Sequence, residues 1–214
     1  MRKSLPLVMW MVLVCLGFVA QGAMAEEFVD GKDYQSLPSQ VPVRDSSKIE
    51  VVELFWYGCP HCYKFDPLVS KWEHQLPEDV DFWQSPAAFN RTWKLHAQTF
   101  YAAEALGVSD EMHQPLFDAL AGQHKPLNSE DSMAKFFAQY GIEEEKFRKA
   151  YNSFSVKSKV QQAVSRGASY RVSGVPVLIV NGKYRIEPGQ AGSFERMLKI
   201  ADFLVEKERA AQGS

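Results

Sequence analysis

Cysteine is scarce in this chain of 214 residues: it has three, and only Cys59 and Cys62 lie beyond the first 25 positions. A disulfide between two cysteines so close in sequence would close too small a loop to restrain the unfolded chain much. The scarcity therefore excludes a framework of structural disulfides. Chemical reactivity explains the pair better than a stabilising role does.

Basic clusters, low-complexity tracts and long apolar runs are also missing after residue 25. The formal net charge is −2, and it becomes −4 once residues 1–25, which hold Arg2 and Lys3 but no acidic residue, are set aside. A mildly acidic chain without a basic patch argues against nucleic acid as a partner. The lack of a later apolar run long enough for a bilayer argues against a membrane span in the body of the chain.

The first 25 residues have the pattern of a secretory signal peptide. Arg2 and Lys3 precede an apolar stretch over residues 5–20, and Ala23-Met24-Ala25 is the small-x-small sequence that signal peptidase recognises. We expect cleavage after Ala25 and export of residues 26–214 to an oxidising compartment. An uncleaved N-terminal membrane anchor is the alternative.

Strand and helix patterns alternate around the cysteine pair. An apolar run over residues 48–56 predicts a strand buried on both faces. Apolar positions at helical spacing predict a helix over 63–75, and residues 80–84 predict a second strand. A strand, a helix and a strand in this order form the crossover unit of a parallel sheet.

The middle of the chain predicts only helices, and the last part returns to sheet. Apolar residues at three- and four-residue spacing predict five helices, over residues 92–106, 111–121, 129–140, 143–152 and 155–170. Two strands, over 177–180 and 183–186, flank the type I′ hairpin signal Asn181-Gly182. A last helix follows from Ser193 to about Lys207. The predicted fold class is therefore α/β, with a helical subdomain inserted into a sheet protein.

The sequence Cys59-Pro60-His61-Cys62 follows a predicted buried strand and opens a helix, a context typical of redox-active cysteines. Cys59 at a helix N-terminus would face unpaired N–H groups and the positive end of the helix dipole, which stabilise a thiolate and lower its pKa. Pro60 suits the first helical turn, since it has no N–H to leave unpaired. His61 adds a donor or a positive charge beside the sulfur, and Cys62 is expected to be the shielded resolving thiol.

A stabilised thiolate exists only in the reduced form, so this arrangement favours a protein that oxidises its partner. His61 supports that direction, and a solvated surface histidine is its alternative interpretation. A zinc site at Cys59 and Cys62 is the rival for the pair. Such sites need four ligands, and the chain offers no second pair of ligands at short spacing.

Two further segments join the predicted site. Glu53 lies six positions before Cys59 in an apolar strand, so we expect a buried carboxyl with a raised pKa that relays a proton to or from Cys62. A solvent-facing strand residue is the alternative for Glu53. Val175-Pro176 precedes the late strand, and proline at a strand's first position has a structural explanation of its own.

Together these residues resemble the DsbA family of bacterial periplasmic disulfide oxidases. The resemblance is carried by Glu53-Leu-Phe-Trp-Tyr-Gly-Cys59-Pro-His-Cys62-Tyr63, by Gly174-Val-Pro176 and by Val180-Asn-Gly-Lys-Tyr184. It implies a thioredoxin-like fold in one domain, residues 26–214. The thioredoxin-like parts would be about 26–89 and 171–214, and the helical insertion about 90–170.

The resemblance also implies the roles of the site residues. Cys59 would be the attacking and leaving sulfur, Cys62 its partner and Glu53 the buried acid. Val175-Pro176 would be a cis bond, with the Val175 backbone pairing with an extended substrate. The implied partners are reduced secreted proteins in the periplasm and a membrane quinone-linked reoxidase of the DsbB type. We expect a monomer with no cofactor beyond the Cys59–Cys62 disulfide.

The expected function is a thiol:disulfide oxidoreductase that oxidises cysteine pairs in secreted proteins. A periplasmic reductase or isomerase of the same fold is an alternative, and a non-catalytic chaperone is another. Phe55, Trp56 and the Val175 region are expected to hold unfolded substrate loosely, although packing in the core is the stronger interpretation for Phe55.

Overall fold

A five-stranded mixed sheet forms the centre of the computed structural model, which describes residues 27–212. Its strand order is β1-β5-β4-β2-β3. The strands are β1 (Gln35–Ser36), β2 (Ile49–Phe55), β3 (Val80–Pro86), β4 (Val177–Val180) and β5 (Tyr184–Ile186). Strand β2 is central, since it pairs with β3 in parallel on one side and with β4 in antiparallel on the other, and all of its residues are buried. The nearly continuous apolar run of β2, interrupted by Glu50 and Glu53, fits a strand covered on both faces.

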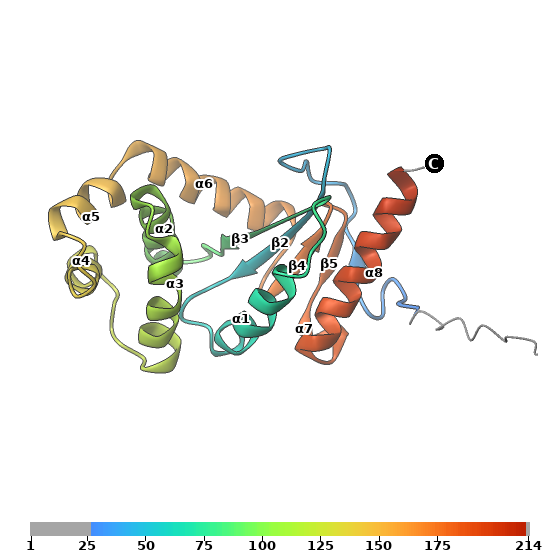
Figure 1. Cartoon of the computed structure of the whole chain (residues 1–214), viewed down its shortest axis with the longest axis horizontal. Helices are drawn as coiled ribbons and strands as arrows, with labels where there is room; N and C mark the ends of the chain where they lie inside the picture. Colours follow the sequence, from blue (N-terminus) through green and yellow to red (C-terminus); the bar gives the residue numbers. More distant parts are fainter. Residues whose placement is uncertain (1–26, 213–214) are drawn as a thin grey trace, which may run out of the picture.

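Helices α1 (Pro60–Glu73), α7 (Pro188–Ala191) and α8 (Phe194–Gln212) accompany the sheet. Helix α1 makes the crossover from β2 to β3, and it lies beside α8 over one face of the sheet (Figure 1). Apolar side chains of α1, α8 and β4 share one core there, among them Phe65, Leu178 and Leu204. This packing fixes the N-terminus of α1 at the end of the central strand.

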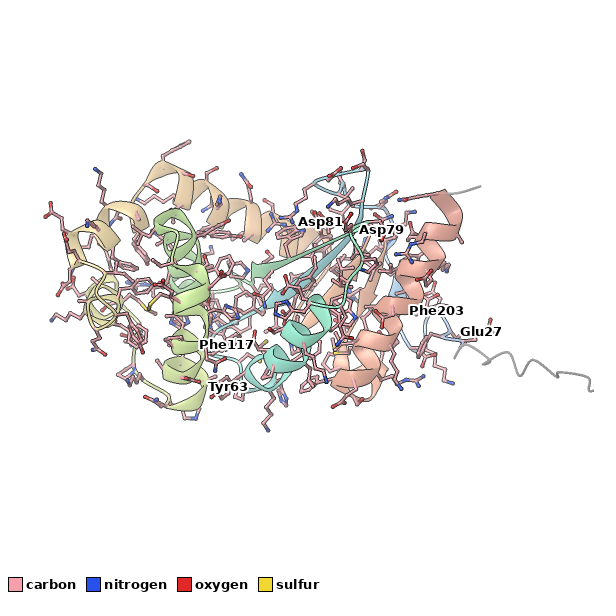
Figure 2. The ribbon with its side chains drawn as sticks, in the orientation of Figure 1. Glu27, Tyr63, Asp79, Asp81, Phe117 and Phe203 are labelled. Atoms are coloured by element: carbon pink, nitrogen blue, oxygen red, sulfur yellow. The ribbon has the colours of Figure 1, made fainter. Side chains whose placement is uncertain are left out.

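The helical insertion lies between β3 and β4 and forms a separate lobe beside the sheet (Figure 1). It consists of α2 (Arg91–Leu106), α3 (Ser109–Phe117), a π-helical turn (Asp118–Gly122), α4 (Glu130–Ala138), α5 (Glu144–Tyr151) and α6 (Phe154–Ser169). Tyr63 of α1 and Phe117 of α3 come together where the lobe meets the sheet (Figure 2), with ring centroids 6.0 Å apart. Both cysteines belong to the core cluster that spans this junction.

The predicted elements are confirmed to within a few residues, with two differences in where helices end, and the short helix α7 lies in a segment where no helix was predicted. The helix expected over 111–121 ends as α3 at Phe117 and continues as a π-helical turn, in which the Gln123 N–H bonds to the carbonyl of Asp118 at 2.7 Å. The last helix extends to Gln212 rather than Lys207. Its final turns are held by tertiary contacts, from Lys183 to Glu208 at 2.6 Å and from Arg209 to Asp79 at 2.6 Å.

The hairpin prediction is also confirmed, since Asn181 and Gly182 have φ angles of 50° and 60°, as a type I′ turn requires. Within residues 27–212, no helix is long and apolar enough to cross a bilayer. The predicted signal peptide and its cleavage site lie outside the described residues.

Candidate active site

Three chain segments meet at one end of the sheet. Cys59 follows β2, and Val175-Pro176 precedes β4, the antiparallel neighbour of β2. The register, which pairs Leu54 with Val177, therefore brings the two segments side by side. The Sγ atom of Cys59 lies 3.5 Å from the carbonyl oxygen of Val175. The Val175-Pro176 peptide bond is cis, as the resemblance implied.

Cys59 is the N-cap residue of α1, and Pro60 is the first residue of the helix. The Cys59 sulfur accepts a hydrogen bond from the Cys62 N–H at 3.4 Å. The pKa of the Cys59 thiol is lowered to about 6. A hydrogen bond from the Cys62 thiol contributes most, and the N–H groups of Cys62 and His61 and the His61 charge add to it, against the opposing effect of burial.

Cys62 differs sharply from Cys59, although both are free thiols in this structure. Cys62 is fully buried, and burial raises the pKa of its thiol, so it stays protonated at neutral pH. Cys59 is 8% exposed, and its lowered pKa makes it the thiolate of the pair. The two sulfurs are therefore suited to opposite tasks, one to attack and leave, the other to hold a proton.

Glu53 is buried in β2, with 1% of its surface exposed, so the interpretation as a solvent-facing strand residue is wrong. Burial raises the pKa of its carboxyl to about 8, and the hydrogen bond that Gln84 Nε2 donates at 2.8 Å only partly opposes this. The charges of Asp66, Glu73 and Cys59 raise it further. A carboxylic acid that is neutral at pH 7 beside the cysteine pair can donate a proton to a leaving thiolate.

The comparison with known proteins decides the family. Residues 78–199 match the model of the DSBA-like thioredoxin domain. The thiol:disulfide interchange protein DsbA of Azotobacter vinelandii is 47% identical over 200 residues, which are 94% of each chain. The chain belongs to the DsbA family.

Solved structures of DsbA proteins support the same assignment. The crystal structure of Pseudomonas aeruginosa DsbA has a TM-score of 0.84 and 47% identity, covering 87% of this chain and 97% of that one. DsbA from Xylella fastidiosa has a TM-score of 0.79 and 35% identity, covering 85% and 98%. The predicted fold class, thioredoxin-like with an inserted helical subdomain, is confirmed. The protein is a thiol:disulfide oxidoreductase, and DsbA proteins use a redox-active cysteine pair.

Other residues expected at the DsbA site are only partly where the sequence placed them. His61 is exposed, and its charge helps to lower the pKa of Cys59. Trp56 and Val175 are partly exposed beside the pair. Phe55 is completely buried, so core packing is confirmed and a direct contact with substrate is wrong for this residue. Within residues 27–212, no group of three or more His, Cys, Asp or Glu side chains could hold a metal ion.

Gln84, the hydrogen-bonding partner of Glu53, was not predicted from the sequence. The parallel register that pairs Ile49 with Val80 also pairs Glu53 with Gln84. The two strands had been identified, so their register was the signal that could have found this residue. His96 and His113 were not predicted either, since they lie on α2 and α3 of the helical insertion and no local pattern marks them.

The thiolate of this DsbA protein is expected to persist well below pH 8. The rate of alkylation of the reduced protein by iodoacetamide should rise with pH with a midpoint near 6, because the pKa of Cys59 is lowered to about 6. The thiolate is fully formed at pH 9 and is lost as the pH falls through about 6. The Cys59→Ser variant is the control and should not react in this range, and a midpoint near 9 in the unreplaced protein would contradict the prediction.

Proposed function

We propose that this protein is a periplasmic oxidase that passes the Cys59–Cys62 disulfide to pairs of cysteines in exported proteins. The observation that carries the proposal is the difference between the two thiols. A thiolate on Cys59 is stabilised by the hydrogen bond from the Cys62 thiol and by the N–H groups at the N-terminus of α1, and it exists only after the disulfide has been reduced. Each unit by which the pKa falls favours the reduced form by about 1.4 kcal/mol, or about 30 mV of two-electron potential.

The reaction proceeds by two exchanges. A substrate thiolate attacks Sγ of Cys59, the Cys59–Cys62 bond breaks, and Cys62 leaves and takes a proton from the Glu53 carboxyl. A second substrate thiolate then attacks the substrate sulfur of the mixed disulfide, and Cys59 leaves as a stabilised thiolate. Two electrons pass to the enzyme, and the substrate gains a disulfide. Glu53 regains its proton from solvent.

The residues around the pair have supporting roles in this proposal. Pro60 opens α1 without leaving an N–H unpaired, and His61 adds positive charge beside the thiolate. The backbone of Val175 pairs with an extended substrate, next to the cis Pro176. The Val175 carbonyl lies 3.5 Å from the Cys59 sulfur, so a paired substrate would lie close to the reacting sulfur.

The organisation of the exported protein completes the proposal. Cleavage after Ala25 releases a monomer of residues 26–214, in which 26–89 and 171–214 are the thioredoxin-like parts and 90–170 the helical insertion. Its substrates are reduced secreted proteins, and a quinone-linked membrane protein of the DsbB type reoxidises Cys59 and Cys62. The redox-active disulfide serves in place of a bound cofactor.

The redox potential tests the direction of transfer. Equilibration with glutathione buffers of graded ratio, followed by tryptophan fluorescence, is expected to give a potential well above the thioredoxin value of about −270 mV. Trp56, which follows β2 and lies close to the pair, is a suitable reporter. The Cys59→Ser/Cys62→Ser double variant is the control and should show no dependence on the buffer. A potential near −270 mV would replace the oxidase with a reductase that uses the same cysteines.

A further inference from the structure

Two histidines of the helical insertion bind the two aromatic residues that lead into the Gly58-Cys59 turn. The Trp56 indole N–H donates to Nδ1 of His96 at 2.8 Å. The hydroxyl oxygen of Tyr57 lies 3.1 Å from Nδ1 of His113. Consecutive side chains of one segment are thus each hydrogen-bonded to a different helix, α2 and α3.

Both histidines are also fixed on the far side of their rings. Nε2 of His96 lies 2.9 Å from the carbonyl oxygen of Leu127, in the loop before α4. Nε2 of His113 lies 2.8 Å from Oδ1 of Asp66, which is on α1 one turn after Cys62. Each ring therefore connects the segment before Cys59 to a second, separate part of the fold.

Helix α2 holds the Trp56 indole with two residues on the same face, since Trp93 and His96 are three positions apart. The Trp93 ring stacks on Trp56 with centroids 4.4 Å apart and planes 13° apart, while His96 accepts the indole N–H. The indole in turn leaves no room for a side chain at Gly58, where an added Cβ would lie 2.4 Å from it. The Trp56 carbonyl accepts the Cys59 N–H at 2.9 Å. The position of Trp56 thus fixes that of Cys59.

We propose that His96 and His113 are positioning residues by which the helical insertion holds Trp56 and Tyr57 and keeps the Cys59 sulfur at the N-terminus of α1. The inference rests on the proposed role of Cys59 as the attacking sulfur. A looser Trp56–Tyr57 segment lets that sulfur leave the N–H groups of the helix. The thiolate is then less stabilised, and the disulfide is a weaker oxidant.

The two histidines respond differently to protonation. An indole N–H only donates, so Nδ1 of His96 has to be the unprotonated nitrogen and Nε2 has to carry the hydrogen. A proton added to Nδ1 of His96 would place its N–H against the indole N–H of Trp56, and the hydrogen bond between them would be lost. A tyrosine hydroxyl both donates and accepts, so the bond between Tyr57 and His113 persists in either state of the imidazole.

The surroundings of the two rings support this difference. Among the described residues, His96 contacts the Trp56 indole and the Leu127 carbonyl and no charged side chain, and burial lowers the pKa of its imidazole. His113 faces the carboxylate of Asp66 on α1. Its charge also lowers the pKa of Glu73, which lies on α1 as well. The hydrogen bond from the Trp56 indole to His96 is therefore fully formed above pH 6.5, and it is lost as the pH falls through the lowered pKa of His96.

Four variants of the full-length mature protein test the inference. Tyr57→Phe removes one hydroxyl from a buried ring, and His96→Leu removes the acceptor for the indole. His96→Asn keeps an acceptor oxygen near the position of Nδ1 but cannot be protonated. Tyr34→Phe is the matched control, because Tyr34 is as buried as Tyr57 and its hydroxyl accepts from Lys207 at 3.4 Å in a different core cluster.

Two measurements are made on each variant, the pH profile of Cys59 alkylation and the equilibrium with glutathione. Tyr57→Phe and His96→Leu are expected to raise the alkylation midpoint by about half a unit, and to shift the glutathione equilibrium about threefold toward the oxidised protein, or about 15 mV. His96→Asn restores the unreplaced values at neutral pH and keeps them in acid, whereas the unreplaced protein drifts toward the His96→Leu behaviour as the pH falls through the lowered pKa of His96. Tyr34→Phe changes neither measurement.

Unchanged midpoints and equilibria in both Tyr57→Phe and His96→Leu would overturn the inference. If His96→Leu does not fold, Tyr57→Phe alone decides, because it deletes a single oxygen atom. Failure of the proposed function looks different. In that case the unreplaced protein would itself equilibrate with glutathione at a potential near the thioredoxin value of about −270 mV, whatever the histidine variants do.

Discussion

Replacement of Cys59 by serine is expected to reduce disulfide transfer to the uncatalysed rate, whereas replacement of Cys62 should trap the reaction half-way. Cys59 alone has a lowered pKa and some exposure, and Cys62 is completely buried with a raised pKa. In Cys62→Ser the Cys59 thiolate still attacks a disulfide, but no resolving thiol is left to release the product. Oxidised glutathione should therefore form a stable adduct with Cys62→Ser.

Mass spectrometry of the intact protein measures the adduct, and oxidation of a dithiol peptide measures the transfer. We expect one added glutathione on Cys62→Ser at neutral pH and none on Cys59→Ser under native conditions. The same two variants unfolded in denaturant are the control, since both cysteines then have ordinary exposure and should react alike. An adduct on native Cys59→Ser would show that Cys62 is accessible, and it would reverse the proposed roles of the two sulfurs.

The order of strands and helices could be predicted because each element carries its own periodicity. Strand β2 is apolar at all positions except Glu50 and Glu53, and the Asn181-Gly182 turn dictates the β4–β5 hairpin by local backbone preference alone. The end of α8 could not be predicted in this way. Its last turns are polar, and they persist because Glu208 and Arg209 form ion pairs with residues distant in sequence.

The residues of the candidate site also fall into two groups, those that local sequence predicts and those that only tertiary packing brings to the site. Cys59 and Cys62 lie one helical turn apart, so their spacing and the preceding strand were enough to predict that Cys62 is the more shielded of the two thiols. Burial of Glu53 followed from the apolar strand around it. His96 and His113 lie 40 and 56 positions from the aromatic residues that they bind. Only the docking of the helical insertion brings them there, and no local pattern encodes that docking.

Replacement of Glu53 by glutamine is expected to stabilise the reduced protein, and increasingly so as the pH rises. The pKa of Glu53 is raised from 4.5 to about 8, so the folded state disfavours the ionised carboxylate. Below pH 4.5 the carboxyl is protonated whether the chain is folded or unfolded, and it causes no loss. Between 4.5 and 8 only the unfolded chain ionises, so stability falls with pH. Glutamine removes this loss, which is about 3 kcal/mol at pH 7 and about 5 kcal/mol above pH 8.

A second buried glutamate provides the matched control. Glu208 is as buried as Glu53, and its burial also raises the pKa of its carboxyl, but hydrogen bonds from Lys183 and Asn181 outweigh this and leave the pKa lowered. Its contribution is therefore present above pH 4.5 and is lost as the pH falls through the lowered pKa, so Glu208→Gln should destabilise the protein at pH 7 and have little effect in acid. Urea unfolding of both variants at pH 4, 7 and 9 checks the two signs. The two signs differ because the hydrogen-bonding partners differ: the Gln84 amide does not neutralise the charge of Glu53, whereas the Lys183 ammonium neutralises that of Glu208. Equal free energies of unfolding for Glu53→Gln and the unreplaced protein at pH 9 would mean that Glu53 ionises freely in the fold, and the carboxyl would then hold no proton for Cys62 at neutral pH.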